Sequence, residues 1–338
     1  MKSYLTIRQK IVILILFLIN NSLYSQNYNW FSYDTNNQSY IAEMHSSLLK
    51  MELVKRNKLH PFYYKSNATE RPFIEVQTGF KLPIFSIENS FEHFDIKASI
   101  STPVSILTLV DMFESETAPV INNDYRFGVQ MLFLFTPQNT NNSYFKNCHI
   151  TLVPIFHEST HIGDEFALHG YSQIPNFARI NVSYEAWQIF AGVNRQHNDK
   201  NKRNLSAEIG YQRLMPYKAG YYDIDTFEVK GYTIIPSEKR DLWIFRTDYC
   251  HHLELKNNTK SELIASIEAR REIKFGYTLN EPEKRVWSFN LYLGYRIPIK
   301  NTQKQLGIYY RYYRGIVPYG QLRNEDGFAL NGISLVIN

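Results

Sequence analysis

The sequence predicts an all-β protein, a transmembrane antiparallel β-barrel of the outer-membrane type with about twelve strands. Three observations favour this fold. Apolar and polar residues alternate with a period of two in segment after segment, the segments are near the ~9–11 residues with which a tilted strand crosses a bilayer, and an export signal precedes them. The 338 residues include 25 Tyr, 22 Phe and 4 Trp, yet the mean hydropathy is −0.36. A barrel wall explains both values, because only every second residue of a strand faces lipid.

The first 25 residues have the pattern of a cleaved secretory signal. Lys2, Arg8 and Lys10 precede the unbroken apolar run 11–19, and a small-residue step ends at Ser25. As a helix this run would rise only ~14 Å, about half of a bilayer core, so cleavage is favoured over a permanent anchor. We therefore expect export to the outer membrane of a Gram-negative bacterium.

Residues 26–71 differ in texture from the rest of the chain. They are polar and rich in Asn and Ser, with one weakly helical patch at 41–53. We expect this segment to form a periplasmic or plug-like N-terminal extension. The barrel is then expected over residues 72–338.

Strand-like alternation begins after Pro72 and continues to the C-terminus. Its clearest example is 287–297, where Trp, Phe, Leu, Leu, Tyr and Ile occupy every second position. The other segments are 74–82, 94–100, 103–110, 125–135, 148–159, 178–191, 204–214, 221–235, 240–256, 260–275, 304–316 and 326–337. Aromatic residues recur near segment ends, as interfacial girdles require. A soluble sandwich or barrel shares the alternation, but the signal, the segment lengths and these aromatics favour the membrane barrel.

Charge and cysteine content limit the classes of function. The 37 Lys and Arg against 32 Asp and Glu leave a net charge of +5, and no basic block extends beyond the neighbourhood of 200–203, which disfavours nucleic acid as a partner. The two cysteines, Cys148 and Cys250, exclude a disulfide scaffold and a four-thiolate zinc site. Whether they pair stays open. The partners that a membrane barrel implies are lipid or lipopolysaccharide and the barrel-assembly machinery.

Titratable groups are most concentrated at residues 157–165, which read His-Glu-Ser-Thr-His-Ile-Gly-Asp-Glu. One hypothesis is a zinc-dependent hydrolase, since His157, Glu158 and His161 have the spacing His-Glu-x-x-His. That motif works on a helix, where two imidazoles at i and i+4 reach one metal and the Glu acts as a general base. Glu185 would be a distant third ligand. The β-rich residues that precede the motif disfavour a helix here, and the metal stays unknown.

A second hypothesis places His157 and Ser159 at positions i and i+2 on one strand face, where the imidazole could activate the hydroxyl. This His-x-Ser pair resembles the active-site motif of outer-membrane phospholipase A and of the lipid A deacylase barrels, which hydrolyse acyl esters at the outer-membrane surface. The resemblance implies Ser159 as nucleophile and His157 as base. It implies Asp164, Glu165 or Glu185 as the group that orients the ring.

The sequence departs from the phospholipase A and deacylase motif at one position, and the same resemblance implies a cofactor. Those families follow the Ser with Asn, whereas this chain has Thr160 and then His161, so the third member of the site is left unassigned. A calcium ion is implied by analogy alone as a stabiliser of the oxyanion, and the residues themselves indicate no cofactor.

A broader resemblance rests on three motifs in order, at 156–165, 179–185 and 313–321. They are similar to the bacterial family called domain of unknown function 1207, with a His-x-Ser-Ser/Thr-His-x-Gly-Asp-Glu stretch, then Asn-x-Ser-x-Glu, then Gly-x-x-Pro-Tyr-Gly-Gln. The resemblance implies an exported β-barrel and supplies no activity. In that family the residue after the first His need not be Glu, which argues against the zinc motif.

A structural alternative remains beside both hypotheses. The polar groups at 157–165 could anchor a loop or plug, with Asp164 and Glu165 paired to an arginine. The arginines considered are Arg179, Arg270 and Arg271. The protein would then be a non-enzymatic barrel, either a pore or a structural surface protein. The alternation around His157 favours a face toward the lumen, whereas a phospholipase-like site would face outward.

Overall fold

The computed structural model describes fifteen stretches of the chain: residues 28–30, 49–56, 73–110, 120–138, 146–162, 179–181, 183–196, 203–216, 218–222, 229–234, 240–254, 260–274, 284–299, 304–318 and 328–337. The predicted signal peptide lies outside them. Within the described residues, no helix has the length and apolarity needed to cross a membrane.

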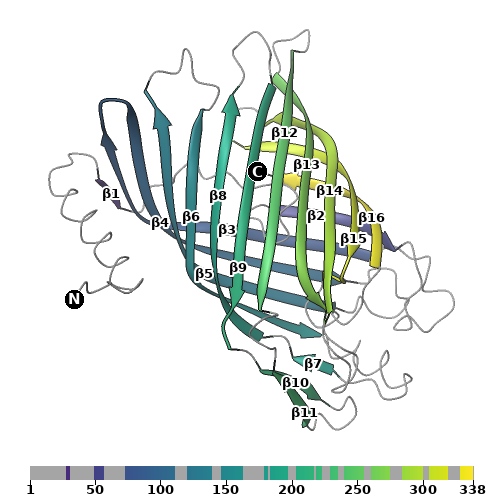
Figure 1. The fold of residues 1–338 in the computed structure, drawn as a ribbon. Helices are drawn as coiled ribbons and strands as arrows, with labels where there is room; N and C mark the ends of the chain where they lie inside the picture. Colours follow the sequence, from purple (N-terminus) through teal and green to yellow (C-terminus); the bar gives the residue numbers. More distant parts are fainter. Residues whose placement is uncertain are drawn as a thin grey trace, which may run out of the picture.

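Sixteen strands are described, and twelve of them form a closed antiparallel barrel (Figure 1). The twelve wall strands are β2 (Leu49–Arg56), β3 (Phe73–Ser90), β4 (Phe94–Val110), β5 (Val120–Pro137), β6 (Asn147–Ile162), β8 (Ser183–Gln196), β9 (Arg203–Leu214), β12 (Asp241–Glu254), β13 (Lys260–Lys274), β14 (Lys284–Pro298), β15 (Gln305–Gly315) and β16 (Phe328–Ile337). The wall closes where β3 pairs with β4, so no long edge strand is left open. The predicted twelve-stranded antiparallel barrel is confirmed.

The remaining strands lie off the wall. β1 (Tyr28–Trp30) pairs with the last part of β3. β7 (Arg179–Asn181), β10 (Lys218–Tyr222) and β11 (Val229–Ile234) form a separate three-stranded sheet, which lies beyond one end of the barrel (Figure 1).

The outer face of the wall is apolar and the inner face is polar. Large apolar side chains that point outward remain 36–62% exposed, which is the inverse of a water-soluble protein. The most exposed of these are Ile333, Ile308, Phe80, Leu82 and Phe127. Such a surface is stable only against lipid, because each exposed apolar Å² would otherwise cost ~25 cal/mol in water.

The inner face is filled by paired charges. Arg311 is 1% exposed and contacts the carboxylates of Glu52 and Glu75. Arg246 bonds Glu208 at 3.0 Å and Glu268 at 2.6 Å. Because these groups are buried, side chains instead of water fill the lumen at their level, and the burial is tolerated because each charge has a partner.

The N-terminal boundary of the barrel differs from the prediction. β2 lies inside the segment expected to be an extension and pairs with β3 and β16 as a full wall strand. Its residues alternate with a strand's period: Leu49, Met51 and Leu53 are 45–50% exposed, while Lys50 and Glu52 are 1% exposed. The expected helical patch at 41–53 is therefore wrong for residues 49–53, because the inward Lys and Glu of a wall strand look like a polar linker.

Three predicted segments also differ. The segments 94–100 and 103–110 are one strand, β4, which spans Pro103 without a break. Segment 221–235 is not in the wall, because β10 and β11 pair with each other and with β7. Segment 178–191 divides at residue 182 into β7 and β8.

The two ends of the barrel differ in the length of their connections. At one end, the short-turn end, the wall strands are joined by residues 91–93, 138–146, 197–202, 255–259 and 299–304. At the other end, the long-loop end, they are joined by residues 57–72, 111–119, 163–182, 215–240, 275–283 and 316–327. The small sheet belongs to the long-loop end.

Candidate functional site

The residues of β6 that face the lumen change from odd-numbered to even-numbered positions along the strand. His149 points inward and bonds Glu208 at 2.9 Å. The pairing of β6 with β8 then shifts register between Val153 and Phe156, and Pro154 sits in this irregularity. After it, Phe156, Glu158 and Thr160 are the buried, inward residues, at 1–3% exposed.

This register shift turns His157, Ser159 and His161 to the outer face. The expected lumen-facing orientation is therefore wrong, and the outward orientation is correct. The extra residue of a bulge reverses the faces that follow it, so extrapolation from His149 fails.

His157 lies between an acid and a hydroxyl from the neighbouring strand β8. Its Nδ1 is 3.2 Å from Oε1 of Glu185, which is its direct cross-strand partner. Its Nε2 is 3.4 Å from Oγ of Ser183. The imidazole is 27% and the carboxylate 50% exposed, so the group is open at the surface. An imidazole held by a carboxylate on one nitrogen and facing a hydroxyl with the other is the arrangement of an acyl-transfer triad.

Ser159 occupies the position beside this group. It is the direct cross-strand partner of Ser183, so two hydroxyls stand side by side on the outer face. The hydroxyl at hydrogen-bond distance from Nε2 is that of Ser183. Ser159 is two residues from His157 along β6, a separation of ~6.6 Å. The hydroxyl that approaches the ring therefore comes from Ser183 on the neighbouring strand.

His161 lies apart from His157. Its ring contacts Tyr125 edge-on, with 5.9 Å between centroids. Four residues along a strand span ~13 Å, and Glu158 points to the opposite face, 3% exposed. The zinc hypothesis for His157, Glu158 and His161 is therefore wrong, because the motif needs a helix and β6 is a strand.

Some predicted residues lie elsewhere. Asp164 and Glu165 lie outside the described residues. Arg270, considered as a partner for them, points inward and bonds Glu268 at 2.7 Å. Cys148 and Cys250 are both free.

The inner face behind the site is tightly hydrogen-bonded. Arg126 donates to Gln188 Oε1 at 2.8 Å, and Gln188 donates to Gln212 Oε1 at 2.6 Å. Thr160 donates to Asn122 at 3.1 Å. These bonds join β5, β6, β8 and β9 across the lumen side, so the strands that carry the site have a rigid backing.

Aromatic rings surround the site on the outer face. Phe127 lies 5.3 Å from the His157 ring. Trp187 is the next outward-facing residue after Glu185 on β8. It begins a row that continues through Tyr211 and Trp243, with ring centroids 5.4 and 5.2 Å apart. Outward Trp and Tyr in a ring mark the membrane–water interface of a barrel. The site thus lies ~7 Å beyond this row, on the side of the long-loop end.

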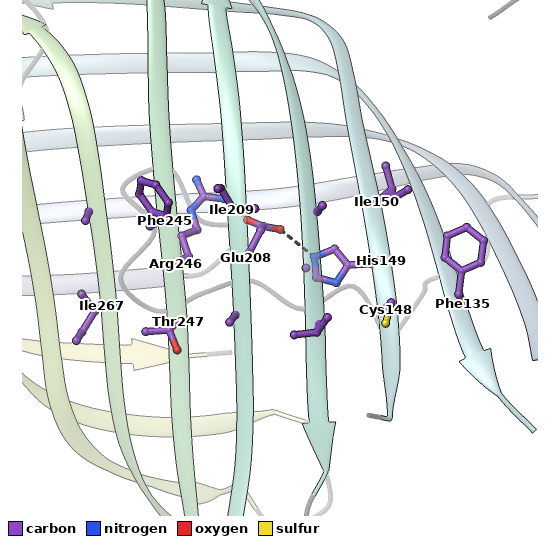
Figure 2. Close-up of a pocket in the computed structure, with 15 residues that line it drawn as sticks. Phe135, Cys148, His149, Ile150, Glu208, Ile209, Phe245, Arg246, Thr247 and Ile267 are labelled. Carbon is purple, nitrogen blue, oxygen red and sulfur yellow. Dashed lines mark hydrogen bonds and ion pairs between the residues drawn. The ribbon is translucent and has the colours of Figure 1, made fainter. Parts of the chain in front are cut away.

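An apolar hollow of about 690 Å³ lies in the wall around strands β6, β8, β9 and β12 (Figure 2). Its lining includes the small side chains of Ala191 and Ala207 and the outward Ile150 and Ile209, which are 40% and 45% exposed. The inward residues His149, Glu208 and Arg246 also contribute to it. Ala191 is six residues from Glu185 on β8, a separation of ~20 Å toward the short-turn end. The hollow opens on the face that contacts lipid.

The calcium expected by analogy can be compared with the donors present. The described side chains beside His157 offer oxygens from Glu185, Ser183 and Ser159. Calcium takes six to eight oxygen ligands, on the order of twice this number. The described part of the site therefore does not fit a calcium ion, and we derive no step through one.

Sequence reasoning identified His157 and Glu185 but did not assign Ser183 a role. The signal was present, because Ser183 and Glu185 are the polar members of the Asn-x-Ser-x-Glu motif at 181–185. They are residues i and i+2 of a strand and so share a face. The missing information was the register that brings this face beside His157.

Comparison with known proteins finds a family resemblance over part of the chain. Residues 60–198 match the family model described as a protein of unknown function (DUF1207), which confirms the expected resemblance over that part of the chain. The motif at 313–321 lies outside the matched range. No curated protein matches the sequence.

Solved structures that resemble the chain are outer-membrane barrels. Outer membrane phospholipase A from Escherichia coli is 10% identical with a TM-score of 0.46, covering 91% of this chain and 94% of that chain. The translocator domain of the autotransporter NalP from Neisseria meningitidis is 8% identical with a TM-score of 0.40, covering 97% and 96%. The toluene transporter TodX from Pseudomonas putida is 10% identical with a TM-score of 0.39, covering 86% and 87%. The likeness concerns the barrel fold alone.

Proposed function

We propose that this barrel hydrolyses acyl esters of lipids at the membrane surface, with Ser183, His157 and Glu185 as its reacting group. The single observation that carries the proposal is the geometry of His157, whose two ring nitrogens face Glu185 at 3.2 Å and Ser183 at 3.4 Å. Histidine in a purely structural role would be expected to bury its ring and saturate it. Here the ring and the carboxylate are open to the outside.

The proposed reaction follows acyl transfer to serine. Ser183 Oγ attacks the ester carbonyl carbon while His157 Nε2 takes the hydroxyl proton. Glu185 accepts the Nδ1–H bond and stabilises the imidazolium that forms. His157 then returns the proton to the leaving alkoxide, which departs as a lysolipid alcohol. Water attacks the acyl-serine with the same base, and fatty acid is released.

The position of the group on the barrel supports a lipid as substrate. Membrane barrels have short periplasmic turns and longer extracellular loops, so we infer that the long-loop end faces outside the cell, in the outer membrane of a Gram-negative bacterium. The predicted signal peptide is consistent with that location. The group then lies at the level of the outer-leaflet headgroups, above the Trp187 row, where the ester bonds of phospholipid or lipopolysaccharide are found.

The apolar hollow supports the same substrate class. An ester held at His157 would direct its acyl chain down the wall, toward the hollow lined by Ala191 and Ala207. A distance of ~20 Å is within reach of a long acyl chain. We propose that the distal part of that chain occupies the hollow.

The first test compares two serines on one surface. The folded protein in detergent should release fatty acid from phospholipid or lipid A. Ser183→Ala should lower the turnover by about 10³-fold or more, while heat-induced unfolding followed by electrophoretic mobility stays unchanged. Ser159→Ala is the matched control, since it removes a neighbouring hydroxyl from the same face. Complete loss of turnover in Ser159→Ala, with turnover retained in Ser183→Ala, would show that Ser159 is the nucleophile.

The rival is a non-enzymatic barrel. The filled lumen around Arg311 and Arg246 does not favour a wide pore. Absence of fatty-acid release from phospholipid and from lipid A by the folded protein would contradict hydrolysis. Single-channel conductance in planar bilayers would then separate a pore from a structural surface protein.

A further inference from the structure

We propose that the lumen holds a zinc-type metal site made of Cys250, His252 and Glu262, independent of the outward group. Cys250 and His252 are i and i+2 on β12, and Glu262 on β13 is the direct cross-strand partner of His252. One ligand atom from each of the three lies within 4.8 Å of the others. A thiol, an imidazole and a carboxylate form a donor set that suits zinc.

The spacing of the atoms fits tetrahedral coordination. His252 Nδ1 is 3.0 Å from Glu262 Oε1. Two ligands bound at ~2.0–2.1 Å to one tetrahedral zinc stand ~3.3 Å apart. The pair therefore needs to open by only a few tenths of an ångström to admit the ion. Cys250 faces the same side, because it packs against the buried cluster formed by Ile264, Tyr292, Tyr309 and Val336.

Glu262 and His252 are each held in place through the side-chain atom that would not bind the metal. Arg296 holds Glu262 through Oε2, at 2.7 Å from Nε and 2.5 Å from the terminal nitrogen, which leaves Oε1 toward His252. Asn204 Nδ2 lies 2.8 Å from His252 Nε2 and donates to it when that nitrogen carries no proton. Turning the Asn204 amide over by 180° would bring its oxygen to the ring instead, so that Nε2–H donates and Nδ1 is left as the ligand atom. Partners that fix the non-ligating atoms are typical of metal sites.

An unsatisfied polar group supports the same position. Tyr309 is 1% exposed, and its hydroxyl oxygen is buried with no hydrogen-bond partner. Its ring extends along β15 over Gly307, and Gly307 pairs with Arg296, the residue that holds Glu262. A hydroxyl buried without a partner costs free energy. A water molecule bound to the metal as fourth ligand would satisfy it.

The site lies near the short-turn end of the lumen, since β12 ends two residues after His252. Metal would therefore arrive from the side opposite the outward group. It would cross-link β12 and β13 and leave one coordination position open for water or a small ligand.

Cobalt(II) is the probe for this proposal, because a thiolate bound to tetrahedral cobalt gives a charge-transfer band in the near ultraviolet. The untagged, refolded barrel should show this band, and zinc should abolish it by displacement. Cys250→Ser should remove the band, whereas Cys148→Ser, which changes the other free cysteine, should leave it unchanged. His252→Ala should weaken cobalt affinity by at least about tenfold, with the adjacent His251→Ala as its control.

The result can also exclude the site. Absence of the band in the folded protein, or an unchanged band in Cys250→Ser, would show that the three residues form only an ion-pair cluster. Circular dichroism on each variant verifies folding. If Cys250→Ser fails to fold, Asn204→Ala, which keeps all three ligands, should still bind cobalt about tenfold more weakly than the parent.

Discussion

Two charged groups on the same wall contrast in their surroundings. Arg311, Glu52 and Glu75 face inward, are at most 3% exposed, and bond one another closely. His157 and Glu185 face outward and are 27% and 50% exposed. Both groups join adjacent or nearby strands. The difference teaches that burial and the direction in which the side chains point, rather than charge content, separate a structural cluster from a reactive one.

The contrast yields a clear expectation. Changes to the inward group should lower stability and leave turnover per folded molecule intact. Changes to the outward group should lower turnover and leave stability intact, because surface substitutions usually shift the free energy of unfolding by less than ~0.5 kcal/mol.

The largest effect on stability is expected from Arg311→Met. It removes the arginine that contacts both Glu52 and Glu75 in the buried interior, and breaking such a buried ion pair costs about 3–5 kcal/mol of unfolding free energy. Urea unfolding in lipid vesicles measures this. Restoration by the triple variant Arg311→Met, Glu52→Gln and Glu75→Gln would confirm that charge imbalance is the cause. An unchanged urea midpoint in the single variant would contradict a structural role for the cluster.

The counterpart on the outer face is Glu185→Gln. The amide keeps the size of the side chain but no longer stabilises an imidazolium, so we expect turnover to fall by about 10²-fold or more. The urea midpoint should stay constant. Asp241, another half-buried outer-face carboxylate, bonds Arg213 at 2.6 Å. Asp241→Asn is therefore a control that should leave turnover within about twofold.

The wall itself could be predicted from sequence because its periodicity is local. Alternation in 287–297 or 125–135 is enough to define a strand and its two faces. β2 could not be recognised, since its inward Lys50 and Glu52 find partners on Tyr292 and Arg311, more than 200 residues away in the chain. The thirteen predicted segments correspond to eleven wall strands, because 221–235 belongs to the small sheet and 94–100 and 103–110 are one strand. β2 is the twelfth strand of the wall.

The site could be predicted only in part. His157 and Glu185 stood out as titratable residues in motifs. The orientation of His157 depends on the register shift between Val153 and Phe156, which no local pattern encodes. The approach of Ser183 to Nε2 depends on the same pairing. Contacts across strands need the register, and the register is a property of the whole closed wall.

A moderate effect is expected from filling the apolar hollow. Ala207 lines the hollow, and Ala207→Trp places a large ring there, so long acyl chains should lose turnover relative to short ones by roughly tenfold. Leu205→Trp adds a similar ring two residues away on the same face of β9, outside the hollow, and should not change the preference. Fatty-acid release from phospholipids that differ only in chain length measures the ratio. If the ratio of long-chain to short-chain turnover were the same in both variants, the acyl chain would not occupy the hollow.

The smallest effect is expected from Phe127→Leu, beside the outward group. The ring of Phe127 lies 5.3 Å from His157 and is itself 53% exposed, so it limits the positions of the imidazole without bonding it. Loss of such a ring pair is worth about 0.5–1.5 kcal/mol, which corresponds to a turnover lower by roughly two- to tenfold. Tyr125→Leu removes the equivalent ring contact of His161 and should leave turnover unchanged. Equal losses in the two variants would mean that the outer-face rings act through anchoring in the membrane, whereas a loss confined to Phe127→Leu locates the reaction at His157.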